Sequence, residues 1–202
     1  MYNGGRRSLD LSMFDVGGLE TVEVLRGSHE NAFGSSGTIN FVPKLSYGNG
    51  VSFYQRFGTY NTGSYHTGLS LGNSLISLDY GTGQSVSRQF YESAESADIL
   101  RESTNQFISA GYRPSADTEI KLYQIKSGRM YNNHYNADSI GSTLLVNTLK
   151  IEHNSERLGQ LELYVSEQKT TGEDDISQLK TDRNDGQVIT GLSYNLPIES
   201  AY

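Results

Sequence analysis

The chain of 202 residues contains no cysteine, no tryptophan and only three prolines. Without cysteine, neither a disulfide nor a thiolate metal site can form within it. No run of eighteen apolar residues occurs, which excludes a membrane-spanning helix. Lysine and arginine total 16 against 23 aspartates and glutamates, for a net charge of -7. This acidic balance argues against nucleic-acid binding, because phosphate contacts need clustered basic side chains.

Glycine and tyrosine are abundant instead, at 22 and 14 residues, while only 35% of the chain is apolar. This composition is typical of many short strands joined by turns, whereas a helical bundle needs long stretches of Ala, Leu, Glu and Lys. We therefore predict an all-β fold. The eight strands expected after the first fifty residues are 51–60, 64–73, 75–87, 104–113, 118–129, 143–154, 160–170 and 187–196.

The connectors between these strands fall into two groups. After the second, fourth, sixth and eighth strands they are short. After the third, fifth and seventh strands, polar segments predict long loops at 88–103, 131–142 and 171–186. Tight turns at one end and long loops at the other are typical of an outer-membrane barrel.

Several of the strands alternate between apolar and hydrophilic residues with a period of two, whereas 118–129 departs from the pattern because Leu122 and Tyr123 place large residues on both faces. Leu161, Leu163 and Val165, for example, are interleaved with polar neighbours and with Tyr164. A barrel wall between lipid and a polar interior needs this pattern. A sandwich in water produces the same pattern with the two faces exchanged. The expected strand lengths suit a membrane span, which takes about nine to eleven residues in a tilted strand.

The stretch in front of these strands, residues 19–44, has a different character. Two strand-like runs, at 22–25 and 39–42, flank a polar segment broken by glycines. Glycine permits positive φ and close approach of the backbone, which a tight turn against a wall requires. We expect a compact hairpin here.

Residues 19–44 resemble the C-terminal end of the plug domain of TonB-dependent outer-membrane receptors. In that family a segment of the form IERVEVLRGP leads to YGSGAIGGVINIVTK and then into the first barrel strand. This sequence has LETVEVLRG and FGSSGTINFVPK at those places, with Ser28 where the family usually has Pro. The matching positions are Leu19, Glu20, Val22, Glu23, Val24, Leu25, Arg26, Gly27, Phe33 (an aromatic for Tyr), Gly34, Ser35, Gly37, Ile39, Asn40 and Lys44.

The resemblance implies a partial transmembrane antiparallel β-barrel, about eight of twenty-two strands, preceded by the end of a plug domain. Residues 1–45 are then the C-terminal part of the plug, and 46–202 are the N-terminal part of the barrel. The chain is expected to be an internal fragment of a longer receptor. The implied structural residues of the plug motif are Glu20, Glu23, Arg26, Gly27, Gly34, Gly37 and Asn40.

Two of these residues have a chemistry that can be read directly. Arg26 would be surrounded by plug and wall, so it needs a carboxylate partner, either Glu20 or Glu23 within the plug or a residue on a barrel strand that this chain lacks. Asn40 can hydrogen-bond neighbouring backbone within a polar lumen. We expect these residues to be structural rather than to contact a substrate.

The implied function is transport rather than catalysis: active uptake of a scarce ligand, such as a metal-siderophore, cobalamin or a glycan, across the outer membrane of a Gram-negative bacterium. The implied partners are outer-membrane lipid, the TonB complex through a segment missing here, and a small-molecule ligand such as a siderophore. No cofactor and no resident metal are expected. Ligand contacts are expected from residues 28–33 and from the three long loops, where aromatic and arginine side chains supply much binding energy. The best candidates are Tyr91, Arg101, Tyr131 and Tyr135.

No catalytic constellation stands out. The four histidines are scattered, with no paired carboxylate at ligand spacing. The acidic run Glu173-Asp174-Asp175 fits a solvated loop better than an EF-hand. Two other functions stay open. One is a small eight-stranded outer-membrane barrel acting as an adhesin or anchor, with residues 1–44 outside its wall. The other is a soluble carbohydrate-binding β-domain with its apolar stripes buried against another sheet.

Overall fold

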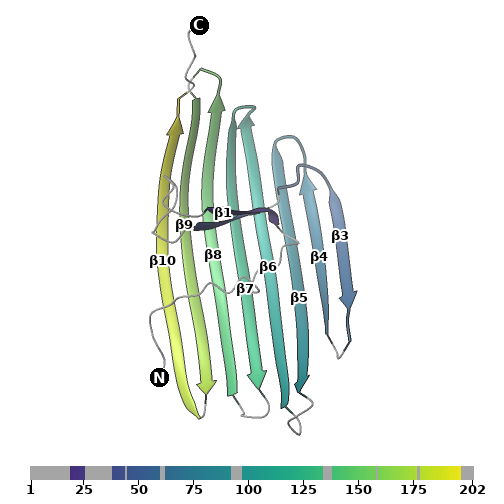
Figure 1. The fold of residues 1–202 in the computed structure, drawn as a ribbon. Coiled ribbons are helices and arrows are strands. Elements are labelled where there is room, and N and C mark those ends of the chain that lie inside the picture. Colours follow the sequence, from purple (N-terminus) through teal and green to yellow (C-terminus); the bar gives the residue numbers. More distant parts are fainter. Residues whose placement is uncertain are drawn as a thin grey trace.

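The computed structural model describes residues 19–25, 38–43, 45–59, 62–91, 97–133, 138–157, 159–176 and 178–196. These residues form a two-stranded sheet and a large eight-stranded antiparallel sheet (Figure 1). The prediction of an all-β fold is confirmed.

Within the described ranges, there is no helix of the length and apolar character needed to cross a membrane.

The large sheet is a meander in which each strand is hydrogen-bonded to the next one in the sequence, in the order β10-β9-β8-β7-β6-β5-β4-β3. All eight predicted strands are present. Their bounds are β3 (Gly50–Phe57), β4 (Gly63–Gly72), β5 (Ile76–Tyr91), β6 (Ala97–Ser115), β7 (Thr118–Asn133), β8 (Asp138–Ser155), β9 (Gly159–Ile176) and β10 (Leu179–Asn195).

The predicted long loops are wrong. Strands β5 to β10 are 16 to 19 residues long, and they take up most of 88–103, 131–142 and 171–186. Only residues 177 and 178 separate β9 from β10. The backbone ladder continues through these segments although both faces have become polar, so the alternation that marks the strands elsewhere is lost.

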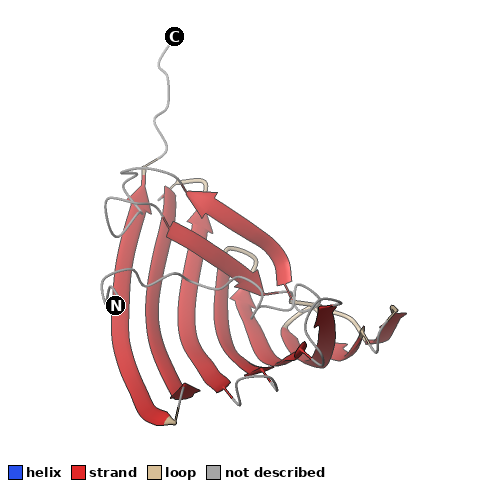
Figure 2. Ribbon diagram, turned by 60° about the horizontal axis from the view of Figure 1, so that its bottom comes forward, coloured by secondary structure: helices blue, strands red, loops and turns tan. Residues whose placement is uncertain are grey.

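The sheet is not closed into a barrel. Strand β3 pairs only with β4, and β10 pairs only with β9, so each leaves one edge without a strand neighbour among the described residues. Figure 2 shows that the sheet is nevertheless strongly curved, with one concave and one convex face. The structure thus contains an open, curved wall of eight strands.

The predicted hairpin unit is also present. Strand β1 (Leu19–Leu25) pairs antiparallel with β2 (Thr38–Pro43) in a sheet of their own, with Val22 opposite Phe41 and Glu23 opposite Asn40. The two strands lie on the concave side of the large sheet, across its middle (Figures 1 and 2).

The two faces of the large sheet differ sharply in chemistry. Following the register from strand to strand, the most buried side chains all fall on the concave, inner face, and most of them are polar. They are His66, Ser77, Asp79, Ser109, Ile125, Ser127, Leu144 and Thr148. The convex, outer face carries most of the large exposed apolar side chains. Examples are Phe53, Leu69, Leu78, Ile108, Leu122, Leu149, Leu163, Val165, Val188 and Leu192.

Candidate functional site

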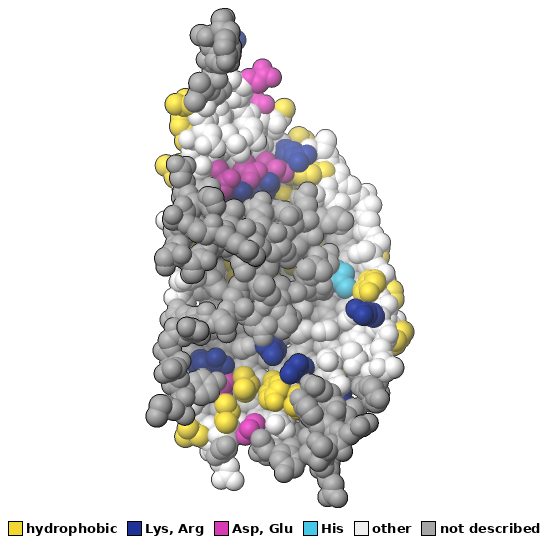
Figure 3. Space-filling view, in the orientation of Figure 1, with side chains coloured by type: hydrophobic (Ala, Val, Ile, Leu, Met, Phe, Trp, Pro, Cys, Tyr) yellow, Lys and Arg dark blue, Asp and Glu magenta, His cyan; other side chains and the backbone are white. Residues whose placement is uncertain are grey.

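The inner face concentrates its charges near the end of the sheet where the tight turns lie. Figure 3 views the concave side and shows acidic and basic side chains together near that end, with further basic side chains near the opposite end. Six of the charged groups at the turn end form a continuous ladder across β6, β7, β8 and β9. In order, they are Arg113, Glu119, Lys121, Glu152, Lys150 and Glu162.

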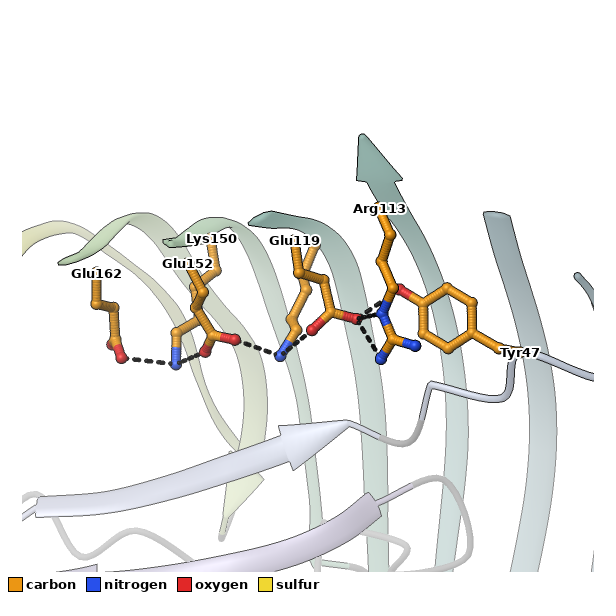
Figure 4. A network of polar contacts seen from close by, with 7 residues as sticks. Tyr47, Arg113, Glu119, Lys150, Glu152 and Glu162 are labelled. Carbon is orange, nitrogen blue, oxygen red and sulfur yellow. Dashed lines mark hydrogen bonds and ion pairs between the residues drawn. The ribbon is translucent and has the colours of Figure 1, made fainter. Parts of the chain in front are cut away.

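The ladder alternates in sign at every step (Figure 4). Arg113 Nη2 lies 3.2 Å from Glu119 Oε1, and Lys121 Nζ lies 3.0 Å from Glu119 Oε2. The same ammonium group reaches Glu152 Oε2 at 2.7 Å. Three cations and three carboxylates thus sum to zero charge on the part of the face that they cover.

The last two steps of the ladder involve the ammonium group of Lys150. It lies 2.7 Å from Glu152 Oε1 and 3.1 Å from Glu162 Oε2. Apart from Arg113, every side chain of the ladder is less than 30% exposed. These groups therefore exchange much of their hydration for one another.

The strand register shows that the ladder separates like charges that would otherwise face each other across the strands. Glu119 lies directly opposite Glu152, which lies directly opposite Glu162, and Lys121 lies directly opposite Lys150. Like charges placed directly across two strands are destabilising. Here a row of carboxylates and a row of ammonium groups are neighbours along the strands, so each lysine contacts one carboxylate on its own strand and a second one diagonally on the next strand.

Tyr47 joins the ladder from outside the sheet. It lies in residues 45–49, which connect the hairpin to β3, and its hydroxyl donates a hydrogen bond to Glu119 Oε1. The guanidinium carbon of Arg113 lies 3.6 Å from the centre of the Tyr47 ring, within cation–π range (Figure 4). Burial, followed by the hydrogen bond to Glu119, raises the pKa of Tyr47 to about 12. The phenol therefore stays protonated, and stays a donor, throughout the neutral range.

Two more hydrogen bonds fasten the same segment to the wall. The backbone N–H of Ser46 donates to Asp79 Oδ2 at 2.9 Å, and the N–H of Gly72 donates to Asn49 Oδ1 at 3.1 Å. Asp79 is only 2% exposed, and its other oxygen has no hydrogen-bond partner within the described structure. We call Ser46, Tyr47 and Asn49, with their contacts on the sheet, the linker clamp.

A pocket of about 520 Å³ opens beside the ladder at the turn end of the sheet. Arg113, Glu119 and Glu152 line it, together with residues of the β6–β7 turn. The described residues contain no group of three or more histidines or carboxylates arranged to hold a metal ion. The arrangement binds the linker to the wall electrostatically, and we find no nucleophile paired with a base among the groups that form it.

At the opposite end of the inner face, the structure brings together two of the four predicted ligand residues. Arg101 on β6 and Tyr131 on β7 are register partners, and the guanidinium carbon lies 6.0 Å from the centre of the ring. Nearby, Arg183 Nη2 donates to Asp174 Oδ1 at 2.8 Å. Asp174 lies in strand β9, so the prediction that it belongs to a solvated loop is wrong. Its carboxylate has an arginine partner.

The remaining predicted residues are placed only in part. Glu20 and Glu23 lie on β1, Asn40 lies on β2, and Tyr91 is the last residue of β5. The structure describes only the backbone of these four residues. Arg26, Gly27, Gly34, Gly37 and Tyr135 lie outside the described residues, as does the segment 28–33. Their predicted roles stay predictions.

No member of the ladder or of the linker clamp was predicted from the sequence. One signal was present: charges of opposite sign two residues apart, at 119 and 121 on one strand and at 150 and 152 on the next. Such spacing places both charges on one face of a strand. Only the register, however, shows that the two pairs lie side by side.

Comparison of the chain with known protein families, with curated proteins and with solved structures found no match.

Proposed function

We propose that this chain forms part of the wall and plug of a TonB-dependent outer-membrane receptor for the active uptake of a scarce ligand, such as a metal-siderophore, cobalamin or a glycan. One observation carries the proposal: the curved sheet exposes its apolar side chains on the convex face and buries polar ones on the concave face. A sheet in water buries its apolar face, because that burial drives folding. The opposite arrangement suits a wall with lipid outside and a polar interior.

The position of the hairpin supports the same proposal. Strands β1 and β2 carry the sequence that resembles the end of a plug, and they lie on the concave side of the sheet (Figure 2). The open edges at β3 and β10 offer unpaired backbone groups to further strands. In lipid such groups have to be satisfied by pairing, since each one left unpaired costs several kcal/mol.

The two alternative functions receive less support. A soluble sandwich needs a second sheet over the apolar stripes, but the only other sheet within the described ranges lies on the opposite face. A small closed barrel needs β3 to pair with β10, and these strands are the two free edges. The proposed receptor is compatible with both observations.

Within this proposal the ladder and the linker clamp have a structural role: they fix the segment that leads from plug to wall. Arg101 and Tyr131 lie on the inner face at the far end, where we propose that they contact the ligand. Ligand-binding sites often combine an aromatic anchor with a few placed polar groups.

The proposal is tested by asking which face of β9 meets lipid. The chain has no cysteine, so Leu163→Cys reports on the outer face and Gln168→Cys on the inner face. Each variant of the whole gene product, with any cysteine outside these 202 residues replaced by serine, is labelled with an environment-sensitive fluorophore. The labelled protein is then reconstituted into phosphatidylcholine vesicles that contain nitroxide-labelled acyl chains.

We expect strong nitroxide quenching and blue-shifted emission at position 163, and neither effect at position 168. Equal quenching at both positions, or none at 163, would show that the convex face is not a lipid face and would refute the proposal.

A further inference from the structure

The outer face has a local interruption in its apolar surface. In one cross-strand row, Gln124, Asn147 and Glu167 are neighbours on β7, β8 and β9. The Gln124 side-chain amide donates to Asn147 Oδ1 at 2.8 Å, and that of Asn147 donates to Glu167 Oε2 at 3.2 Å. The same row continues into Ile108 on β6 and Val188 on β10, so apolar residues flank the polar trio on both sides.

Two lysines stand in the next row, on the side away from the tight turns. Lys126 on β7 and Lys169 on β9 are both register partners of Leu145 on β8. They are therefore two strand spacings, about 10 Å, apart. Both side chains are exposed, and we find no ion pair or hydrogen bond for either ammonium group in the described part of the chain. We call Gln124, Lys126, Asn147, Glu167 and Lys169 the outer notch.

The notch lies at the loop-side edge of the apolar surface. On β9 the outward apolar run from Leu161 to Val165, about 14 Å long, ends just before Glu167. On β10 the outward side chains are largely apolar from Leu196 back to Val188, which is level with Glu167. The two lysines lie one row further on, level with Gln106 and Gly186. If the apolar surface lies in the hydrocarbon core, the notch lies where that core meets the headgroups.

Polar groups at this boundary can be satisfied by lipid headgroups, whereas a polar group left in hydrocarbon loses the hydrogen bonds that water provided. Lysine side chains reach toward headgroups along their flexible stems, and they attract anionic lipid.

We infer that the outer notch binds the phosphate groups of lipid headgroups, with Lys126 and Lys169 as the anchoring cations and the amides of Gln124 and Asn147 as further polar neighbours. This inference rests on the proposed function, since it requires the convex face to meet lipid.

The test places a local reporter between the two lysines. Leu145→Cys, labelled with the same fluorophore in the purified whole gene product, is titrated with phosphatidic acid in micelles of a neutral detergent. Parallel titrations use digalactosyl diacylglycerol, which has no phosphate, and inorganic phosphate, which has no acyl chains. Each titration is repeated in the Lys126→Gln/Lys169→Gln double variant. Lys180→Gln is the matched control, since Lys180 is an exposed outward lysine at the far end of β10.

Phosphatidic acid should shift the emission at position 145, and the galactolipid and inorganic phosphate should not. A lysine near a membrane surface contributes about 1 kcal/mol to anionic-lipid binding, so losing two should raise the half-saturating concentration about 25-fold. The control variant should titrate like the parent protein. An unchanged titration in the double variant, an equal response to galactolipid, or a response to inorganic phosphate would each overturn the inference.

The outcome is separable from that of the proposed function. If position 163 is quenched by lipid and position 145 shows no dependence on phosphate, the receptor proposal stands and the notch is a plain lipid contact. If position 163 is not quenched, both fail.

Discussion

Lys121 and Lys150 face each other directly across β7 and β8, one step from a matching row of carboxylates. Ion pairs on a surface contribute little to stability, but these are partly buried and each cation separates two carboxylates. The energetic effect of one side chain therefore includes the repulsion that it prevents. The contributions of the ladder residues to stability are therefore not additive.

We predict that Lys121→Met lowers the free energy of unfolding by about 2 kcal/mol, because Glu119 and Glu152 then face each other without a cation between them. The measurement is denaturant unfolding of the whole gene product in detergent. Lys180→Met is the comparison: that lysine is 73% exposed and lies 4.0 Å from Asp175, so its loss should cost less than about 0.5 kcal/mol. Equal effects of the two substitutions would mean that the interleaved rows have no special role.

At the scale of strands, close approach between neighbours depends on glycines on the inner face. The ring of Phe107 on β6 lies over Gly81 on β5, and a Cβ at position 81 would come within 2.0 Å of it. The ring of His66 on β4 stacks against Phe107 with the two planes 3° apart. The Phe107 ring thus packs across three consecutive strands that the backbone ladder already pairs.

We predict that Gly81→Ala destabilises the protein by about 1–3 kcal/mol, since the Phe107 ring has to leave its position. Gly186→Ala on β10 is the control, because a Cβ there meets only ordinary contact distances. This second substitution should be neutral or slightly stabilising, through the smaller entropy of the unfolded chain. Denaturant unfolding of both variants checks the prediction, which fails if Gly81→Ala leaves stability unchanged.

The strands were predictable where one face is apolar. Leu161, Leu163 and Val165 on β9 have that pattern, whereas Leu122 and Tyr123 on β7 put large residues on both faces. The loop-side halves could not be predicted, because residues such as Thr171, Glu173 and Asp174 are hydrophilic on both faces, so the sequence has no apolar alternation there.

The candidate site depended on information that the sequence does not contain. Glu119 and Glu152 are distant in the chain, and only the register places them on adjacent strands. The linker clamp could not be predicted from the sequence for a related reason. The contact between Tyr47 and Arg113 depends on where the linker lies relative to the sheet. The pairing of Arg101 with Tyr131 likewise follows from register, although both residues had been singled out for their chemistry.

For the molecule as a whole, the open edges of the large sheet limit the states in which the isolated chain is stable. Among the described residues, β3 and β10 each have one edge without a strand neighbour, which favours association with other strands. Closing eight strands on themselves would leave a lumen wide enough only for side chains, and the hairpin would then have to leave the concave side.

We therefore predict that the 202-residue chain, produced alone and placed in detergent, does not form a compact barrel. Its mobility on a semi-native gel should be the same with and without heating, and proteases should cleave it readily. The whole gene product, run alongside, should migrate faster before heating than after it. A compact, protease-resistant form of the isolated chain would contradict this prediction.

The linker clamp has a mechanical consequence. Any tension applied to the hairpin reaches the wall through residues 45–49, where Ser46, Tyr47 and Asn49 are each tied to a different part of the sheet. A load along this segment therefore acts on these three contacts before it acts on the pairing of β3 with β4. The hairpin can thus be pulled while β3 keeps its place at the edge of the sheet.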